Sequence, residues 1–142
     1  MDSKEVFFIG IKGVGITALA LAMQDAGWSV SGSYSDESFI TDYILSKRSI
    51  KIQSFSDPIP KVDRIIYSAA YSAPVGAMSL AEALADFVKD RQVIAVAGVG
   101  GKTTTSAMLA VLFHSAGRDV GYYVGTGSIS GLEAPGHFGI DP

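Results

Sequence analysis

Short apolar runs alternate with segments of helical periodicity in the first part of the chain. Four strand-like runs occupy residues 6–9, 28–32, 50–55 and 64–68. Between them, residues 14–26 and 39–48 carry apolar side chains at the spacing of a helix. The first run, Val6-Phe7-Phe8-Ile9, is apolar on both faces, as in a buried parallel strand. The alternation predicts an α/β fold with a parallel sheet.

A further helix is predicted over residues 79–90, because Ser79 and Glu82 have the spacing of a capping box. The pattern then restarts with a buried strand, a helix and another strand, over residues 93–97, 103–116 and 120–124. Gly117 stands where the second of these elements is expected to end.

The restart predicts two domains, one over residues 1–90 and one over residues 91–142. Only forty residues follow Lys102, too few to complete a second sheet, so we expect the chain to be a fragment of a longer protein. Residues 131–142 are rich in turn formers and poor in apolar residues. We therefore expect them to be disordered, and His137 to belong to no site.

A glycine-rich turn joins the first predicted strand to the first predicted helix. It reads Gly10-Ile11-Lys12-Gly13-Val14-Gly15. Glycines let the backbone approach a ligand closely, and the free amides and dipole of the following helix attract a phosphate. The dinucleotide pattern has glycine where Lys12 stands and an acid at the end of the second strand, where this chain has Ser33 and Tyr34. The turn predicts a diphosphate site, at which Lys12 either touches a phosphate or is simply solvated.

A second glycine-rich turn begins the restarted pattern. It reads Gly98-Val99-Gly100-Gly101-Lys102-Thr103-Thr104-Thr105. Lys102 is placed to reach the β- and γ-phosphates of a nucleotide, and the Thr103 hydroxyl to bind Mg²⁺. The turn is shorter than the general P-loop pattern, which requires glycine at Val96. It predicts a triphosphate site, but no acidic residue ends a later apolar strand to hold the metal.

Four motifs taken together resemble the Mur ligases, in the branch that acts on UDP-N-acetylmuramate with L-alanine or with recycled muropeptides. The motifs are residues 8–17, similar to the uridine-diphosphate loop; Val30-Ser31-Gly32-Ser33, similar to the second-strand signature; Tyr67-Ser68-Ala69-Ala70, similar to the turn after the fourth strand; and residues 98–105, similar to the family's short ATP loop. The resemblance extends to about residue 127. Four motifs in the family's order are more specific than any one of them.

The resemblance implies a Rossmann-like domain that binds UDP-N-acetylmuramate, followed by the beginning of a P-loop ATPase domain that binds ATP and Mg²⁺. In the family's reaction the lactyl carboxylate of the sugar is phosphorylated by ATP, and the amino group of L-alanine then displaces phosphate to form an amide. The residues that would contact the UDP-sugar are Gly10, Lys12, Gly13, Val14, Gly15, Ile16, Thr17, Ser33, Ser68, Ala69 and Ala70. Those that would hold ATP are Gly98, Val99, Gly100, Gly101, Lys102, Thr103 and Thr104, with Lys102 catalytic and Thr103 on the metal.

Three departures from the family's pattern affect these expectations. The family generally has aspartate where Tyr34 stands, and threonine and histidine at the positions of Val99 and Gly100. It also inserts a helix and a strand where residues 73–79 make a short connection. By the same resemblance, the family's remaining metal ligands and its amino-acid domain would lie beyond residue 142, so the fragment is expected not to catalyse ligation alone.

Composition and net charge narrow the function classes that are open to this chain. The net charge of −3 gives no basic field for a nucleic acid, and the absence of cysteine excludes disulfides and thiolate zinc sites. No signal peptide or membrane span is visible, so we expect a cytoplasmic protein. Two other functions stay open: a nucleotide-binding module without catalysis, and an oxidoreductase that uses NAD. The Lys102-Thr103 pair argues against the oxidoreductase, which has no need of it.

Overall fold

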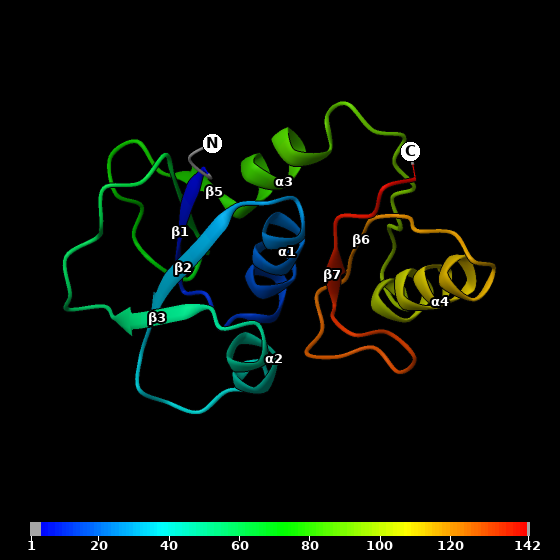
Figure 1. Cartoon of the computed structure of the whole chain (residues 1–142), viewed down its shortest axis with the longest axis horizontal. Helices are drawn as coiled ribbons and strands as arrows, with labels where there is room; N and C mark the ends of the chain where they lie inside the picture. The colour runs from blue at the N-terminus through cyan, green and yellow to red at the C-terminus, as the bar shows by residue number, and fades with distance from the viewer. Residues whose placement is uncertain (1–3, 142) are drawn as a thin grey trace.

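A computed structural model describes residues 4–141 and contains a five-stranded, fully parallel sheet (Figure 1). The strands are β1 (Glu5–Ile9), β2 (Ser29–Tyr34), β3 (Lys51–Ser54), β4 (Arg64–Tyr67) and β5 (Met78–Ser79). Their order across the sheet is β3-β2-β1-β4-β5. The four strands expected in the first part of the chain are confirmed, and β5 is an additional short strand that pairs with β4.

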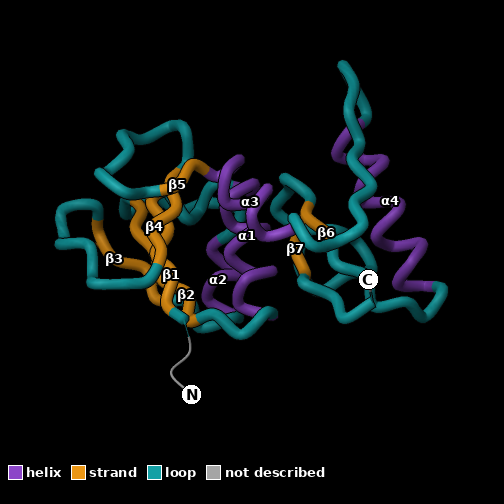
Figure 2. The backbone as a smooth tube through the Cα atoms, turned by 90° about the horizontal axis from the view of Figure 1, so that it is seen from above, coloured by secondary structure: helices purple, strands orange, loops and turns teal. Residues whose placement is uncertain are grey.

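Three helices lie together on one side of the sheet: α1 (Val14–Asp25), α2 (Asp42–Lys47) and α3 (Leu80–Val88) (Figure 2). The expected capping box starts α3, because the Ser79 hydroxyl accepts from the Glu82 amide at 3.2 Å and the Glu82 carboxylate accepts from the Ser79 amide at 2.8 Å. The helix expected over residues 39–48 is shorter than its pattern predicts. Phe39 and Ile40, in the turn that does not form, are 41% and 70% exposed, so little packing holds an additional turn there.

Helix α1 is the centre of the core. Residues 16–23 are all buried, which means that both faces of the helix are covered. Val6, Phe8 and Ile66 of the sheet join this core with Leu19 and Leu21 of the helix. We call residues 4–88, with this sheet and α1 to α3, the sheet unit.

The outer face of α1 is covered by a ribbon of two antiparallel strands, β6 (Tyr122–Tyr123) and β7 (Gly136–His137) (Figure 1). Gly136 lies so close to the helix that a Cβ there would overlap the carbonyl of Ala18. We call residues 119–141 the C-terminal segment. The expected disorder of residues 131–142 is wrong over residues 131–141, because packing on α1 orders them; Pro142 lies outside the described residues.

Helix α4 (Lys102–Ser115) confirms the expected helix, and Gly117 follows it with φ +74°. The buried strand expected over residues 93–97 is wrong: these residues form no strand, and Val93 and Ile94 are 58% and 69% exposed. A parallel strand needs a neighbour to satisfy its amides, and the described residues provide none there. The last expected strand is reduced to β6 and an isolated bridge between Val120 and Asp141.

No helix within residues 4–141 has the length and apolar character that a bilayer crossing requires.

Candidate functional site

The first glycine loop lies beyond the carboxyl end of β1 and is held by β2. The amides of Gly10 and Ile11 both donate to the carbonyl of Ser33, at 3.0 and 3.2 Å, and the Gly13 amide donates to the Gly10 carbonyl at 3.1 Å. Gly10 has φ +83°, a conformation that favours glycine. Ser33 thus acts in the loop through its carbonyl, while the residue itself is buried.

The amino end of α1 is open to an anion. Its N-cap, Gly13, has no side chain to accept from the helix, and the first turn contains no acidic residue. The amides at the start of a helix have no partner within the helix and carry the positive end of its dipole. Because Gly13 has no side chain, a phosphate has room to approach the first amides of the helix beside it.

Two buried threonine hydroxyls fix the first glycine loop through its backbone carbonyls. Thr17 Oγ1 donates to the carbonyl of Ile11 at 2.6 Å, and Thr41 Oγ1 donates to the carbonyl of Lys12 at 2.6 Å. The side chains of Ile16 and Thr17 lie in the core, so any contact of these two residues with a ligand is restricted to the backbone. The sequence analysis missed Thr41, because no motif connects it to a loop 29 residues earlier.

Lys12 is neither free nor simply solvated. Its ammonium donates to the carbonyl of Glu37 at 2.8 Å, lies 3.0 Å from the carboxylate of Asp42, and stands 5.4 Å from the ring centre of Tyr34. The Phe39 amide, together with Lys12, holds the pKa of Asp42 below its ordinary value, so this carboxylate stays ionised beside the ammonium. Lys12 therefore joins the loop to the segment that follows β2.

Four aromatic side chains gather at the carboxyl edge of the sheet, and the sequence analysis missed this aromatic cluster. It consists of Tyr34, Phe39, Phe55 and Tyr71, with neighbouring ring centres 4.8 to 6.4 Å apart. The ring of Tyr71 covers Gly10 so closely that a Cβ would overlap it. Burial raises the pKa of Tyr71, and the neighbouring Tyr34 hydroxyl adds to this effect. A usable signal existed, because Tyr34, Phe55 and Tyr71 each come at or soon after the end of a strand.

A hollow of about 470 Å³ opens beside this cluster, at the ends of β2 and β3. Its lining includes Lys12, Tyr34, Asp36, Asp42 and Gln53. The hollow is open to solvent on one side.

The turn after β4 lies on the other side of the first loop. The Ser68 amide donates to the carbonyl of Ile9 at 3.1 Å, and the Tyr71 amide donates to the carbonyl of Ser68 at 3.0 Å. Ala69 and Ala70 form the tip of this turn. The structure therefore brings the three motifs of the sheet unit together at one edge of the sheet.

Tyr123 reaches this edge from the C-terminal segment. A Cβ on Gly15 would lie only 2.9 Å from the Tyr123 hydroxyl, so the glycine makes room for this side chain at the first turn of α1. Burial raises the pKa of Tyr123, and the phenol therefore remains protonated and able to donate. In the sequence analysis this residue belongs only to the strand expected over residues 120–124.

The second glycine loop is formed but stands apart from any strand. Gly101 is the N-cap of α4 with φ +73°, and the ammonium of Lys102 donates back across the loop to the carbonyl of Gly98 at 2.9 Å. No side chain caps the helix, and Val99 is fully exposed. Gly100, Thr103 and Thr104 are exposed as well, so the amides and hydroxyls of this loop face solvent.

The loop fits the phosphates of a nucleotide better than it fits their metal. Lys102 and the uncapped amides of α4 suit an anion, whereas residues 4–141 contain no group of three His, Asp or Glu side chains that could hold a metal. The first acid after the loop, Asp119, follows the far end of α4. The 14 residues of that helix span about 21 Å, so Asp119 is far from Thr103.

Comparison with known proteins relates the chain to one family of ligases. The family model "Mur ligase family, catalytic domain" matches residues 5–99. A UDP-N-acetylmuramate–L-alanine ligase from Campylobacter jejuni is 39% identical over 131 residues, which cover 83% of this chain and 30% of that protein. The ligase of the same name from Borreliella burgdorferi is 34% identical over 88% of this chain and 31% of its own length.

Solved structures share the fold. A UDP-N-acetylmuramate-alanine ligase from Thermotoga maritima matches 97% of this chain and 35% of its own, with a TM-score of 0.86 and 26% identity. A murein peptide ligase from Psychrobacter arcticus matches 99% of this chain with a TM-score of 0.79, and at 24% identity it supports the fold alone. The chain spans about 30% of the length of the curated relatives it matches.

Proposed function

Because this chain belongs to the Mur ligase family, we propose that its sheet unit binds UDP-N-acetylmuramate and that its second glycine loop binds the phosphates of ATP, in a ligase that joins L-alanine to that sugar nucleotide. The curated relatives named above carry this activity in their names. The proposed boundary between the two functions lies near residue 90, between α3 and the ATP loop. Cytoplasmic location belongs to the same proposal.

The observation that carries the proposal is the open amino end of α1 beside the aromatic cluster. We assign the diphosphate to the amides after Gly13, where the positive end of the helix dipole favours an anion. The uridine would lie toward the hollow at the ends of β2 and β3, which Tyr34 lines. The turn Ser68-Ala69-Ala70 would border the ligand on the β4 side.

At the second loop, the ammonium of Lys102 would leave the Gly98 carbonyl and bind the phosphate that is transferred. The loop amides would bind the remaining phosphates of ATP. The Thr103 hydroxyl would bind Mg²⁺, with the remaining ligands coming from outside the described residues. When bound, ATP supplies the phosphoryl group that activates the lactyl carboxylate for attack by the amino group of L-alanine.

Two variants of Gly13 test the diphosphate assignment. Gly13 has φ −61° and ψ 135°, and a Cβ there would meet its nearest neighbours at 3.5 Å, so a side chain is accommodated. Aspartate and asparagine are both good N-caps of nearly equal shape, and only aspartate adds a negative charge. We expect Gly13→Asp to weaken binding of UDP-N-acetylmuramate at least about tenfold relative to Gly13→Asn, the effect of about 1.4 kcal/mol of repulsion.

Calorimetric titration of the 142-residue chain and both variants with UDP-N-acetylmuramate, and of the chain with NAD, measures this difference. Urea unfolding of the variants checks that both fold. Equal affinity of the aspartate and asparagine variants would remove the diphosphate from α1. Tighter binding of NAD than of the UDP-sugar would favour a dinucleotide enzyme instead.

A second candidate function is a nucleotide-binding module without catalysis. It is favoured by the unpaired segment before the ATP loop and by the absence of metal-binding carboxylates near it within residues 4–141. In a complete ligase that contains this chain, Lys102→Ala is expected to lower kcat by at least ~10²-fold, the usual cost of losing one electrostatic stabiliser. A complete protein whose turnover is indifferent to this change would favour the module.

A further inference from the structure

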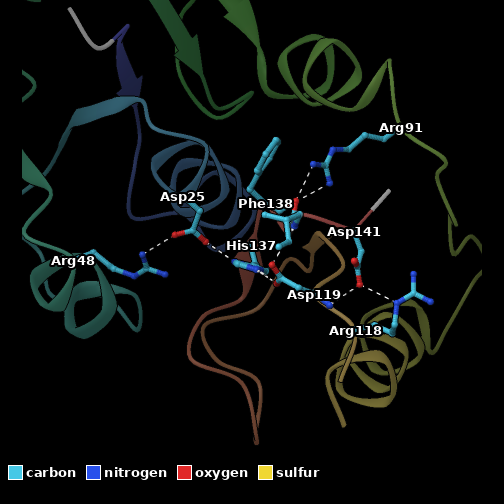
Figure 3. A network of polar contacts seen from close by, with 10 residues as sticks. Asp25, Arg48, Arg91, Arg118, Asp119, His137, Phe138 and Asp141 are labelled. Carbon is cyan, nitrogen blue, oxygen red and sulfur yellow. Dashed lines mark hydrogen bonds and ion pairs between the residues drawn. The ribbon is translucent and has the colours of Figure 1, made fainter. Parts of the chain in front are cut away.

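His137 stands between two carboxylates from different parts of the chain (Figure 3). Its Nδ1 lies 2.6 Å from the carboxylate of Asp25, the last residue of α1, and its Nε2 lies 2.6 Å from the carboxylate of Asp119, just after α4. The residue is at the end of β7, on the ribbon that covers α1. One side chain thus connects the sheet unit, the ribbon and the carboxyl end of α4.

This geometry fixes the protonation state of the ring. A neutral imidazole has one N–H and one lone pair, so it can donate to only one of two carboxylates. With an oxygen 2.6 Å from each nitrogen, both nitrogens must donate, unless one carboxylate is itself protonated. The hydrogen bond from His137 holds the pKa of Asp119 below its ordinary value, with help from the Ile140 amide, so that carboxylate is ionised. Asp25 accepts from the Arg48 guanidinium at 2.7 Å through its other oxygen, so this carboxylate also acts as an acceptor. His137 is therefore an imidazolium in this arrangement.

The surroundings of the ring contain charges of both signs. Asp25 also accepts from Arg48 at 2.7 Å, and Asp141 accepts from Arg118 at 2.8 Å (Figure 3). The ionisable groups that face His137 or line the hollow beside it are Asp25, Arg48, His114, Arg118, Asp119, Tyr122, Glu133 and, through Arg118, Asp141. Burial lowers the pKa of His137, but the hydrogen bonds to Asp119 and Asp25 outweigh it, so the pKa is raised overall.

Little else fixes α4 against the sheet unit. Ala110 is its one buried residue within the described chain, and the segment before the helix, residues 93–101, is almost entirely exposed. Other contacts of the C-terminal segment lie elsewhere: Arg91 donates to the carbonyls of Phe138 and Gly139, at 2.8 Å each, and stacks on the Phe138 ring. Arg118 and Asp119, after the end of α4, also bond to Asp141 and Ile140 of the C-terminal segment. The ring of His137 differs from these contacts because it continues from Asp119 to Asp25 of α1.

We propose that His137 is a positioning residue: in its doubly protonated form it ties the end of α4 to the end of α1, and so sets the ATP loop relative to the UDP-sugar loop. The tie follows from the geometry alone, whereas its role in aligning two substrates rests on the proposed function. The tie also has a pH dependence of defined sign. A histidine whose pKa is raised by folding stabilises the folded arrangement below its unfolded pKa, and this contribution is lost as the pH rises through the folded value.

Nuclear magnetic resonance of the 142-residue chain tests the proposal without any nucleotide, so its outcome is independent of substrate binding. The ¹⁵N shifts of the His137 ring report the protonation of each nitrogen during a pH titration. Amide hydrogen exchange, corrected for its intrinsic pH dependence, reports the opening of residues 119–124 and 136–141. The variant His137→Gln removes the imidazolium, and His114→Gln is the matched control, because His114 makes no such bridge in the described structure.

We expect both ring nitrogens of His137 to carry protons at pH 6.5 and the ring to titrate above about 6.5, the ordinary value for histidine. Above that titration, exchange in the C-terminal segment should become about fivefold faster, the order expected for a partly exposed ion pair, while β1 is unchanged. His137→Gln should show the faster exchange at every pH, and His114→Gln should behave as the parent chain. A neutral His137 ring at pH 6.5, or the same pH-dependent exchange in His137→Gln, would overturn the proposal; should that variant not fold, the ring titration of the parent chain decides.

Discussion

Gly10 is the residue on which the first loop turns. Its φ of +83° costs alanine about 1–2 kcal/mol, and a Cβ would also overlap the ring of Tyr71. We expect Gly10→Ala to lower the free energy of unfolding by about 2 kcal/mol or more, measured with urea. The double variant Gly10→Ala/Tyr71→Ala should lose less than the sum of the single variants, because the overlap is gone. Strict additivity would show that Tyr71 does not pack on this glycine.

At the scale of single residues, the sequence predicts backbone roles better than side-chain roles. Glycine turns are visible in the sequence because a positive φ and a close approach leave few other residues possible, and Gly10 and Gly101 have the expected conformations. Lys12, Thr41 and His137 have partners that lie 25, 29 and 112 residues away in the chain. Such contacts depend on the assembled fold, and no local pattern encodes them.

Helices α1 and α4 have similar patterns but opposite environments. The sheet and the β6–β7 ribbon bury α1, whereas Met108 and Leu112 on α4 are 67% and 63% exposed. In the 142-residue chain we expect Leu19→Ala to cost about 2–5 kcal/mol of stability, and Met108→Gln or Leu112→Gln less than about 0.5 kcal/mol. Urea unfolding of the three variants checks this order. A comparable loss from either glutamine variant would mean that α4 is packed in solution.

A helix or strand was predictable where a local sequence signal coincides with a neighbouring element that it can pack against or pair with. The signals are the capping box of α3, the glycine after α4, and the strand-like runs of β1, β2 and β4. Each of these elements forms. Residues 93–97 have the pattern of a buried strand without a neighbouring strand among the described residues, and they form no strand and are mostly exposed. Residues 136–137 show the reverse, since a weak pattern becomes a strand because α1 offers a surface.

The whole molecule is a stack of layers: sheet, three helices, ribbon and α4 (Figure 2). The first glycine loop joins the sheet to α1 within this stack, with β2, the turn after β4, and β6 contributing residues around it. The second loop lies at its outer edge and is supported only by its own helix. The two loops should therefore differ in their affinity for a ligand. The first loop retains its surroundings in this chain, whereas the second is expected to bind ATP with a Kd no lower than about 1 mM, near −4 kcal/mol.

Each of the two glycine loops is proposed to bind its own ligand. The most direct test is a titration of the ¹⁵N-labelled 142-residue chain, monitored by the chemical shifts of its backbone amides. UDP-N-acetylmuramate is predicted to shift Val14, Gly15 and Ile16 at the start of α1 and to leave residues 98–104 unchanged. ATP at millimolar concentration is predicted to shift residues 98–104, with a smaller response in the Lys102→Ala variant. Shifts of residues 98–104 by the UDP-sugar, with none at the start of α1, would contradict the account.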